Sequence, residues 1–444
     1  MLYTQINVWL RRPALALLSL LLLGCPPAEE TQNTPPGPPS DTPDPDDPKD
    51  PDVDIADWTF LVFMNGDNDL EAYVFYDLNE LERAGSTEDL NIIVQADRVD
   101  GHYTGDGDWT GTRRYYVTQD DTPGVVSEVV EDLGELDMGD PQVLSDAMVW
   151  AHENYPAEKM AVILWNHGDG WSIRTDDDGT GIDTDAFPEG GLEGFEDTLP
   201  PPIISSDETS GSGIDIAQGE LAEAFEEIVE LRGKVDVVGF DACLMGAWEV
   251  AHVLQPYAHT MVASETSVGM TGYQYDLMLP EIAAAPESDA ATMADLLAWS
   301  AVEGNEQTQA AIDLSKLSAL TSAIDNLANV VLNDSTLQSD LLSARSDTNR
   351  LEFGWHDYYL DLGHFAEHLS DESRSRLSSE GTSIHEALDE TLISLYTNQR
   401  FTWAGGLSIY ADTNQVYLDD YANGAGATWS QETQWDEMLQ ALED

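Results

Sequence analysis

The feature that most constrains the fold is a short apolar run, residues 58–64, in which Thr59 is the only polar side chain. An amphipathic strand would show polar residues at every second position, so a nearly continuous apolar run is typical of a strand buried on both faces. Similar runs occur at residues 91–97, 160–165 and 235–240, and helical patterns occur at residues 70–84, 141–154, 219–231 and 243–254. Strands that alternate with helices in this way predict an α/β layered domain with a mostly parallel sheet.

The C-terminal part of the chain has a different pattern. From about residue 283 to residue 398 helical patterns dominate, and residues 405–410 return to strand character. We therefore expect a core at residues 58–282 and a helical region at residues 283–444 that rejoins the main fold.

The N-terminus predicts export. Arg11 and Arg12 precede an apolar run, residues 14–23, which is too short to be a confident membrane span but suits a signal peptide. The run ends in Leu-Leu-Gly24-Cys25, which resembles the lipobox of bacterial lipoproteins. That resemblance implies a signal peptide at residues 1–24 and a lipid on Cys25, and so a protein held at the cell envelope by an anchor and not by a span. The alternative is an ordinary signal peptide with an accidental cysteine.

Residues 25–57 predict a disordered tether, because proline, aspartate, threonine and serine dominate and almost nothing apolar interrupts them. Charge restricts the partners further. The chain has 85 Asp and Glu against 17 Lys and Arg, a net charge of −68. Nucleic acid is excluded as a partner by repulsion from its phosphates, whereas calcium and basic peptides are favoured.

Two loops place a reactive side chain just after a buried strand. Asn166-His167-Gly168 follows residues 160–165, and Asp241-Ala242-Cys243 follows residues 235–240. Ligands of open α/β sheets bind at the carboxyl ends of the strands, so neighbouring strands would bring the imidazole and the thiol together. If Cys25 is lipidated, Cys243 has no disulfide partner, and at the start of the expected helix its pKa would be lowered. Alone, a His-Gly after a strand is more often a turn histidine, and a cysteine at a helix start is more often a buried packing residue.

Five segments resemble, in the same order along the chain, the clostripain family of cysteine peptidases, which share the caspase-like fold with gingipains and legumains. They are residues 63–70, 166–168, 206–211, 241–245 and 406–410. The resemblance implies a caspase-like fold and a Cys243–His167 dyad that forms an acyl-enzyme. It also implies an oxyanion site made of the backbone N–H groups of Gly168 and Cys243. We expect no required cofactor, although some clostripain-like enzymes depend on calcium.

The resemblance also assigns Asp241 to a pocket for Arg or Lys, since clostripain-like enzymes cleave after basic residues. A carboxylate there would pair with a guanidinium through two hydrogen bonds. The alternative role for Asp241 is the N-cap of the helix expected to start at Cys243.

Family members are often zymogens cut after a basic residue between the histidine and the cysteine. In that interval lie Arg174, Arg232 and Lys234, and only Arg174 opens a Gly/Asp-rich stretch. We expect processing at Arg174; the alternative is an enzyme active without cleavage. In the same stretch Asp176, Asp178 and Asp183 are candidate calcium ligands, although the glutamate that completes an EF-hand is missing and a solvated loop is the simpler interpretation.

The sequence thus predicts an exported, monomeric cysteine endopeptidase that acts on proteins or peptides with basic residues and contacts the membrane through its lipid only. Two rival functions remain open. One is a catalytically inactive surface-binding protein of the same fold, and the other is a transpeptidase whose acyl-enzyme is captured by an amine.

Overall fold

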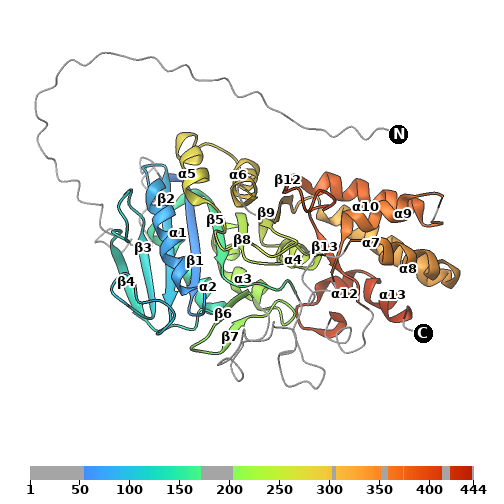
Figure 1. The fold of residues 1–444 in the computed structure, drawn as a ribbon, viewed down its shortest axis with the longest axis horizontal. Coiled ribbons are helices and arrows are strands. Elements are labelled where there is room, and N and C mark those ends of the chain that lie inside the picture. The colour runs from blue at the N-terminus through green and yellow to red at the C-terminus, as the bar shows by residue number, and fades with distance from the viewer. Residues whose placement is uncertain are drawn as a thin grey trace, which may run out of the picture. The chain divides into compact units, whose positions relative to one another are not determined.

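The computed structural model describes residues 55–171, 204–302, 307–349, 351, 359–373, 375–412 and 421–442. The strands of its central sheet are β1 (Ala56–Gly66), β2 (Leu90–Arg98), β3 (Thr112–Tyr116), β4 (Val129–Gly134), β5 (Ala157–Trp165), β8 (Val235–Asp241), β9 (Ala258–Ala263), β10 (Thr308–Asp313) and β12 (Leu392–Thr397). Within the described ranges the sheet has nine strands in the order β12-β10-β9-β8-β5-β1-β2-β3-β4 (Figure 1). The pairs β9–β8, β8–β5, β5–β1 and β1–β2 are parallel. The pairs at the two ends of the sheet, β12–β10, β10–β9, β2–β3 and β3–β4, are antiparallel.

Strand β1 shows why the middle of the sheet is buried on both sides. Leu61 and Phe63 belong to one hydrophobic cluster, and Phe60 and Val62 belong to another. All four side chains are almost completely buried. Successive side chains of a strand point to opposite faces, so this apolar run requires a layer of helices on each face.

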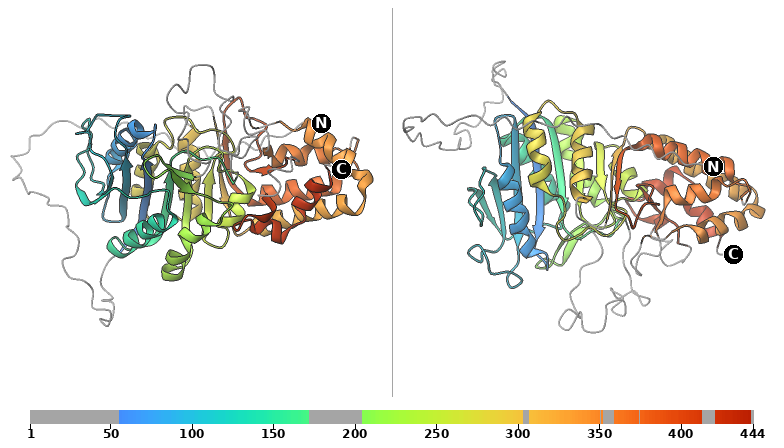
Figure 2. Two further views of the ribbon diagram at one scale, coloured as in Figure 1. Left: turned by 90° about the horizontal axis from the view of Figure 1, so that it is seen from below. Right: turned by 45° about the horizontal axis from the view of Figure 1, so that its top comes forward.

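Those two layers are present. Helices α1 (Glu71–Ala84), α5 (Tyr275–Ala284) and α6 (Ala290–Val302) contribute side chains to the cluster that contains Phe60. In the right-hand view of Figure 2 these blue and yellow helices lie in front of the strands. Helices α2 (Pro141–Asn154), α3 (Glu220–Arg232) and α4 (Trp248–Leu254) contribute to the cluster that contains Phe63. The predicted α/β fold with a mostly parallel sheet is confirmed.

The C-terminal region lies beyond the β12 edge of the sheet (Figure 1). Its helices are α7 (Leu317–Asn333), η2 (Ser335–Leu337), α8 (Gln338–Asp347), α9 (Leu362–Ser370), α10 (Ser378–Thr391), α12 (Thr428–Glu432) and α13 (Trp435–Ala441). Two short pairs lie outside the main sheet, β6 (Ile204–Asp207) with β7 (Ser212–Ile214) and β11 (Tyr359–Asp361) with β13 (Ser408–Tyr410).

The structure adds detail to two sequence predictions about elements. The stretch 283–398 is not helical throughout, because it contains β10 and β12, which extend the main sheet. The strand predicted at residues 405–410 forms as β13, but it pairs with β11 outside the main sheet. Its link to the core is a parallel bridge from Ser408 to Ala247.

Candidate active site

Strands β5 and β8 are neighbours, and their pairing brings the two predicted loops together. In the parallel register Trp165 lies opposite Asp241, and the N–H of Asn166 donates to the carbonyl oxygen of Asp241 at 3.3 Å. His167 and Cys243 each follow two residues beyond this last pair. A Cβ atom added to Gly168 would lie 2.7 Å from the carbonyl oxygen of Cys243, so a side chain at residue 168 would collide with the cysteine loop. The backbones of the two loops are therefore in contact.

The histidine loop is fixed by the side chain of Asn166. Its amide Nδ2 donates to the carbonyl oxygens of Asn65, at 2.7 Å, and of Ser206, at 3.1 Å. Its Oδ1 accepts from the Ser206 hydroxyl at 3.0 Å and from the backbone N–H of His167. These bonds join the loop after β5 to the end of β1 and to β6. The three segments thus form one hydrogen-bonded rim at the carboxyl ends of the strands.

The imidazole of His167 is bound by a carboxylate that sequence reasoning did not identify. Nε2 of His167 lies 2.7 Å from Oδ1 of Asp69, and 46% of the histidine side chain is exposed. The hydrogen bond to His167 lowers the pKa of Asp69 below its ordinary value, more than partial burial raises it. Asp69 lies just after β1, the strand next to β5. An acidic residue at the carboxyl end of a neighbouring strand was the sequence signal that could have identified it.

The thiol of Cys243 is partly buried, and its Sγ accepts from the backbone N–H of Val268 at 3.3 Å. Burial raises the pKa of the Cys243 thiol. The prediction of a pKa lowered by a helix start is wrong, because α4 begins only at Trp248.

The backbone after Cys243 explains this correction. Leu244 adopts a left-handed conformation with a φ of 62°. The N–H groups of Leu244 and Gly246 donate to the carbonyl oxygens of Thr266, at 3.1 Å, and Ser264, at 2.7 Å. A left-handed residue interrupts the right-handed backbone that a helix requires, so no helix starts at Cys243, and the segment bonds to residues 264–266 of the same chain.

Asp241 lies beneath the cysteine loop with only 5% of the residue exposed. Its Oδ2 accepts from the backbone N–H of Tyr273 at 3.0 Å and from the Tyr275 hydroxyl at 2.9 Å. Burial raises the pKa of Asp241 to about 6, and these two hydrogen bonds oppose the shift. The alternative role as a helix N-cap is wrong, because no helix starts at Cys243.

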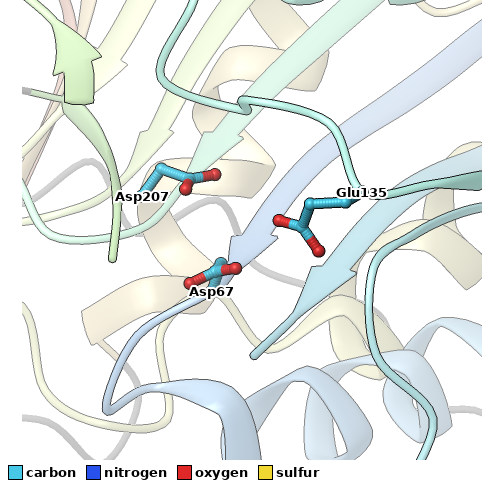
Figure 3. Close-up of side chains that lie close together, drawn as sticks. All are labelled: Asp67, Glu135 and Asp207. Carbon is cyan, nitrogen blue, oxygen red and sulfur yellow. The ribbon is translucent and has the colours of Figure 1, made fainter. Parts of the chain in front are cut away.

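A second group of carboxylates lies on the same rim. Asp67, Glu135 and Asp207 each offer an oxygen within 4.8 Å of the others, an arrangement able to hold a metal ion (Figure 3). This group has no metal-binding spacing in the sequence, because its members come from three separate segments. The predicted calcium ligands Asp176, Asp178 and Asp183 lie outside the described residues, as do the predicted processing site Arg174 and the predicted lipidation site Cys25.

None of the helices in the described ranges is both long and apolar enough to cross a membrane.

Comparisons with known proteins agree with this arrangement. The sequence matches the clostripain family over residues 62–188 and 197–442. It is 28% identical over 246 residues to clostripain from Hathewaya histolytica, a match that covers 51% of this chain and 42% of that protein. The chain thus aligns with less than half the length of that relative.

Two solved structures share the fold. A secreted C11 cysteine protease from Bacteroides thetaiotaomicron, in complex with an irreversible peptide inhibitor, is 20% identical with a TM-score of 0.60, over 86% of this chain and 99% of that one. An inactive zymogen C11 protease from Parabacteroides distasonis is 17% identical with a TM-score of 0.57, over 87% and 99%. Because the family match covers well over half of the sequence and includes both rim loops, the chain belongs to the clostripain family.

Proposed function

We propose that this protein is a cysteine endopeptidase that cleaves after Arg or Lys, with Cys243 as nucleophile and His167 as acid and base. The observation that carries the proposal is the β5–β8 register, which ends in Trp165 opposite Asp241 and leaves the two loops in backbone contact. Family membership and the cysteine proteases among the structures of the same fold support it.

The raised pKa of Cys243 determines how the reaction starts. A thiol with a raised pKa is protonated at neutral pH, and only the thiolate is a good nucleophile. His167 must therefore accept the proton as sulfur attacks the scissile carbonyl carbon. The protonated imidazole then gives this proton to the leaving amine, and the acyl-enzyme that remains is hydrolysed by water.

The oxyanion of the tetrahedral intermediate is assigned to the backbone N–H groups of Gly168 and Cys243. The close approach of Gly168 to the Cys243 carbonyl supports this assignment, because the two residues lie side by side without an intervening side chain. Fixed backbone donors of this kind stabilise the negative charge without having to reorganise during the reaction.

Asp69 is assigned as the residue that positions His167. An ionised carboxylate only accepts hydrogen bonds, so Asp69 fixes Nε2 as the protonated nitrogen of the neutral ring. Nδ1 is then left to exchange the proton with sulfur and with the leaving amine.

Asp241 is assigned as the carboxylate that recognises the basic side chain of the substrate. It is the acidic residue two positions before the nucleophile, and its carboxylate is held in place by Tyr273 and Tyr275. A guanidinium or ammonium group that reached Asp241 would meet an anion in a dry environment, where charge pairing is strong.

The remaining assignments rest on the sequence and the family alone. We propose attachment to the cell envelope through a lipid on Cys25, activation by cleavage at Arg174, and action as a monomer on proteins or peptides with accessible basic residues. No cofactor is assigned to the reaction, and Asp176, Asp178 and Asp183 stay as candidate calcium ligands of the Arg174 stretch.

The test uses matched fluorogenic peptides that end in Arg, Lys or Leu before the cleaved bond. Wild-type protein should cleave the Arg and Lys peptides, and Cys243→Ala should lose activity by a factor on the order of 1,000 or more. Mass spectrometry of the products separates hydrolysis from capture of the acyl group by an added amine. A Cys243→Ala protein as active as the wild type would remove the proposal. The same mass measurement shows whether the active chain is cut at Arg174.

A further inference from the structure

The ends of three strands bring three carboxylates to one point on the rim. Asp67 directly follows β1, Glu135 directly follows β4, and Asp207 is the last residue of β6. Figure 3 shows the three side chains converging, and one oxygen of each lies within 4.8 Å of the others. Three anions from separate segments do not come together unless something else holds them there.

Backbone donors satisfy only part of this group. Oδ1 of Asp67 accepts from the N–H of Thr209 at 3.0 Å. The two oxygens of Asp207 accept from the N–H groups of Ser210, at 2.8 Å, and Met138, at 3.0 Å. Oδ2 of Asp67, however, has no hydrogen-bond partner, although Asp67 is completely buried. A buried carboxylate oxygen without a donor costs free energy, and a cation at this point would supply the missing partner.

No positive side chain of the described residues neutralises the group. None of the described Lys, Arg and His side chains forms an ion pair with Asp67, Glu135 or Asp207. The cluster therefore carries uncompensated negative charge.

We propose that Asp67, Glu135 and Asp207 bind one hard divalent cation of the calcium class. Calcium prefers carboxylate and other oxygen ligands at about 2.3–2.6 Å and accepts six to eight of them in flexible geometry, so ligand oxygens on one ion lie within about 5 Å of each other. Glu135 is exposed, which gives the ion a path from solvent and leaves room for water ligands. Magnesium fits less well, because it demands a near-ideal octahedron and holds its own water.

The position of this cation site has a consequence for the rim. Asp67 and Asp69 belong to the same short loop, which the carbonyl of Asp67 also ties to the N–H of Glu208 at 2.8 Å. A cation would join this loop to the end of β4 and to the β6–β7 hairpin. It would thereby hold the segment that presents Asp69 to His167. The cation acts on structure and takes no part in the chemistry at Cys243.

The test measures cation binding and not peptidase activity, so its outcome does not depend on the peptidase assignment. Thermal unfolding of the full chain carrying Cys243→Ala is compared in EDTA, in calcium chloride and in magnesium chloride. At about 5 mM calcium chloride we expect a rise in Tm of about 3–5 °C, as for a site with micromolar affinity, and a smaller rise with magnesium. Adding Glu135→Gln should remove most of the calcium effect and leave the Tm in EDTA unchanged or higher, because the substitution relieves repulsion.

Glu227→Gln is the matched control, since Glu227 is an exposed glutamate of α3 away from the cluster. It should retain the whole calcium effect. An equal calcium effect in Glu135→Gln and in its parent would overturn the proposal, because it would assign the effect to the acidic surface in general. A parent that gains nothing from calcium would also overturn it, and would indicate that Asp67 and Glu135 share a proton instead. Isothermal titration should give one calcium ion fewer in Glu135→Gln than in Glu227→Gln.

Discussion

The two sides of the rim hold their reactive groups by opposite means. On the histidine side the pair is exposed to solvent, with 46% of the His167 side chain and 59% of the Asp69 side chain accessible. The pKa of Asp69 is lowered by its hydrogen bond to the imidazole. On the cysteine side burial dominates. It raises the pKa of the Cys243 thiol and raises the pKa of Asp241 to about 6.

This difference in burial determines how strongly each carboxylate interacts with a charged partner. Exposed ion pairs contribute only about 0.2–1 kcal/mol, because water and salt screen them. A buried carboxylate interacts far more strongly with a charge brought to it, and breaking such a pair costs about 2–5 kcal/mol. We therefore expect the buried side to decide which substrates are accepted, and the exposed side to adjust how fast they react.

The largest effect should come from Asp241→Asn. The substitution keeps the shape and the acceptor for Tyr273 but removes the charge, so kcat/KM for an Arg peptide should fall by about 100-fold. For the matching citrulline peptide, which has the same shape without the charge, kcat/KM should change little. The measurement is the ratio of the two values. An equal fall for both peptides would mean that Asp241 only supports the fold.

The next effect is the pH dependence of the same ratio. Asp241 is ionised above its raised pKa of about 6 and neutral below it. A basic substrate needs the ionised form, so the ratio of Arg to citrulline kcat/KM should be constant above about pH 7. At one pH unit below the pKa, the ratio should be about tenfold lower than this constant value. Any ionisation that affects both peptides alike cancels in the ratio. A ratio independent of pH between 5 and 8 would contradict the assignment of Asp241 to substrate recognition.

The sequence predicted those parts of the site that depend on local pattern. The apolar runs of β1, β5 and β8 located the sheet edge, and helix α2 has the predicted ends because Asp140 caps it and Pro141 begins it. The adjacency of the His167 and Cys243 loops followed from strands that proved to be neighbours.

What the sequence missed depends on contacts between distant segments. Residues 243–247 have the composition of a helix, but Leu244 takes a left-handed conformation, and the N–H groups of Leu244 and Gly246 bond to residues 264–266. Strands β10 and β12, at one end of the sheet, are short, and only the pairing of β10 with β9 and with β12 distinguishes them from helix. The group of Asp67, Glu135 and Asp207 has no spacing to recognise, because the fold alone assembles it.

A smaller effect is expected on the exposed side. Asp69→Asn removes the charged acceptor of His167 Nε2. The amide that replaces it can present either its oxygen or its NH2 group to the ring. We expect kcat to fall by about three- to fivefold, the size of an exposed pair, with the Arg to citrulline ratio unchanged. Glu208→Gln is the matched control, because Glu208 forms another exposed pair, 3.0 Å from His102, on the same rim. A changed ratio in Asp69→Asn would show that the two sides of the site do not act separately.

The smallest effect should come from Tyr275→Phe, which alters the buried side without removing its charge. The Tyr275 hydroxyl donates to Oδ2 of Asp241 at 2.9 Å and so stabilises the ionised carboxylate. Its loss should raise the pKa of Asp241 and move the midpoint of the Arg to citrulline ratio upward by about half a unit to one unit. At pH 8, where the carboxylate is still ionised, the ratio should change by less than about twofold. Tyr76→Phe is the control, since Tyr76 is 64% exposed and should leave the midpoint in place. An unchanged midpoint in Tyr275→Phe would mean that another group controls the pH dependence, and that the buried carboxylate is not the one that the substrate meets.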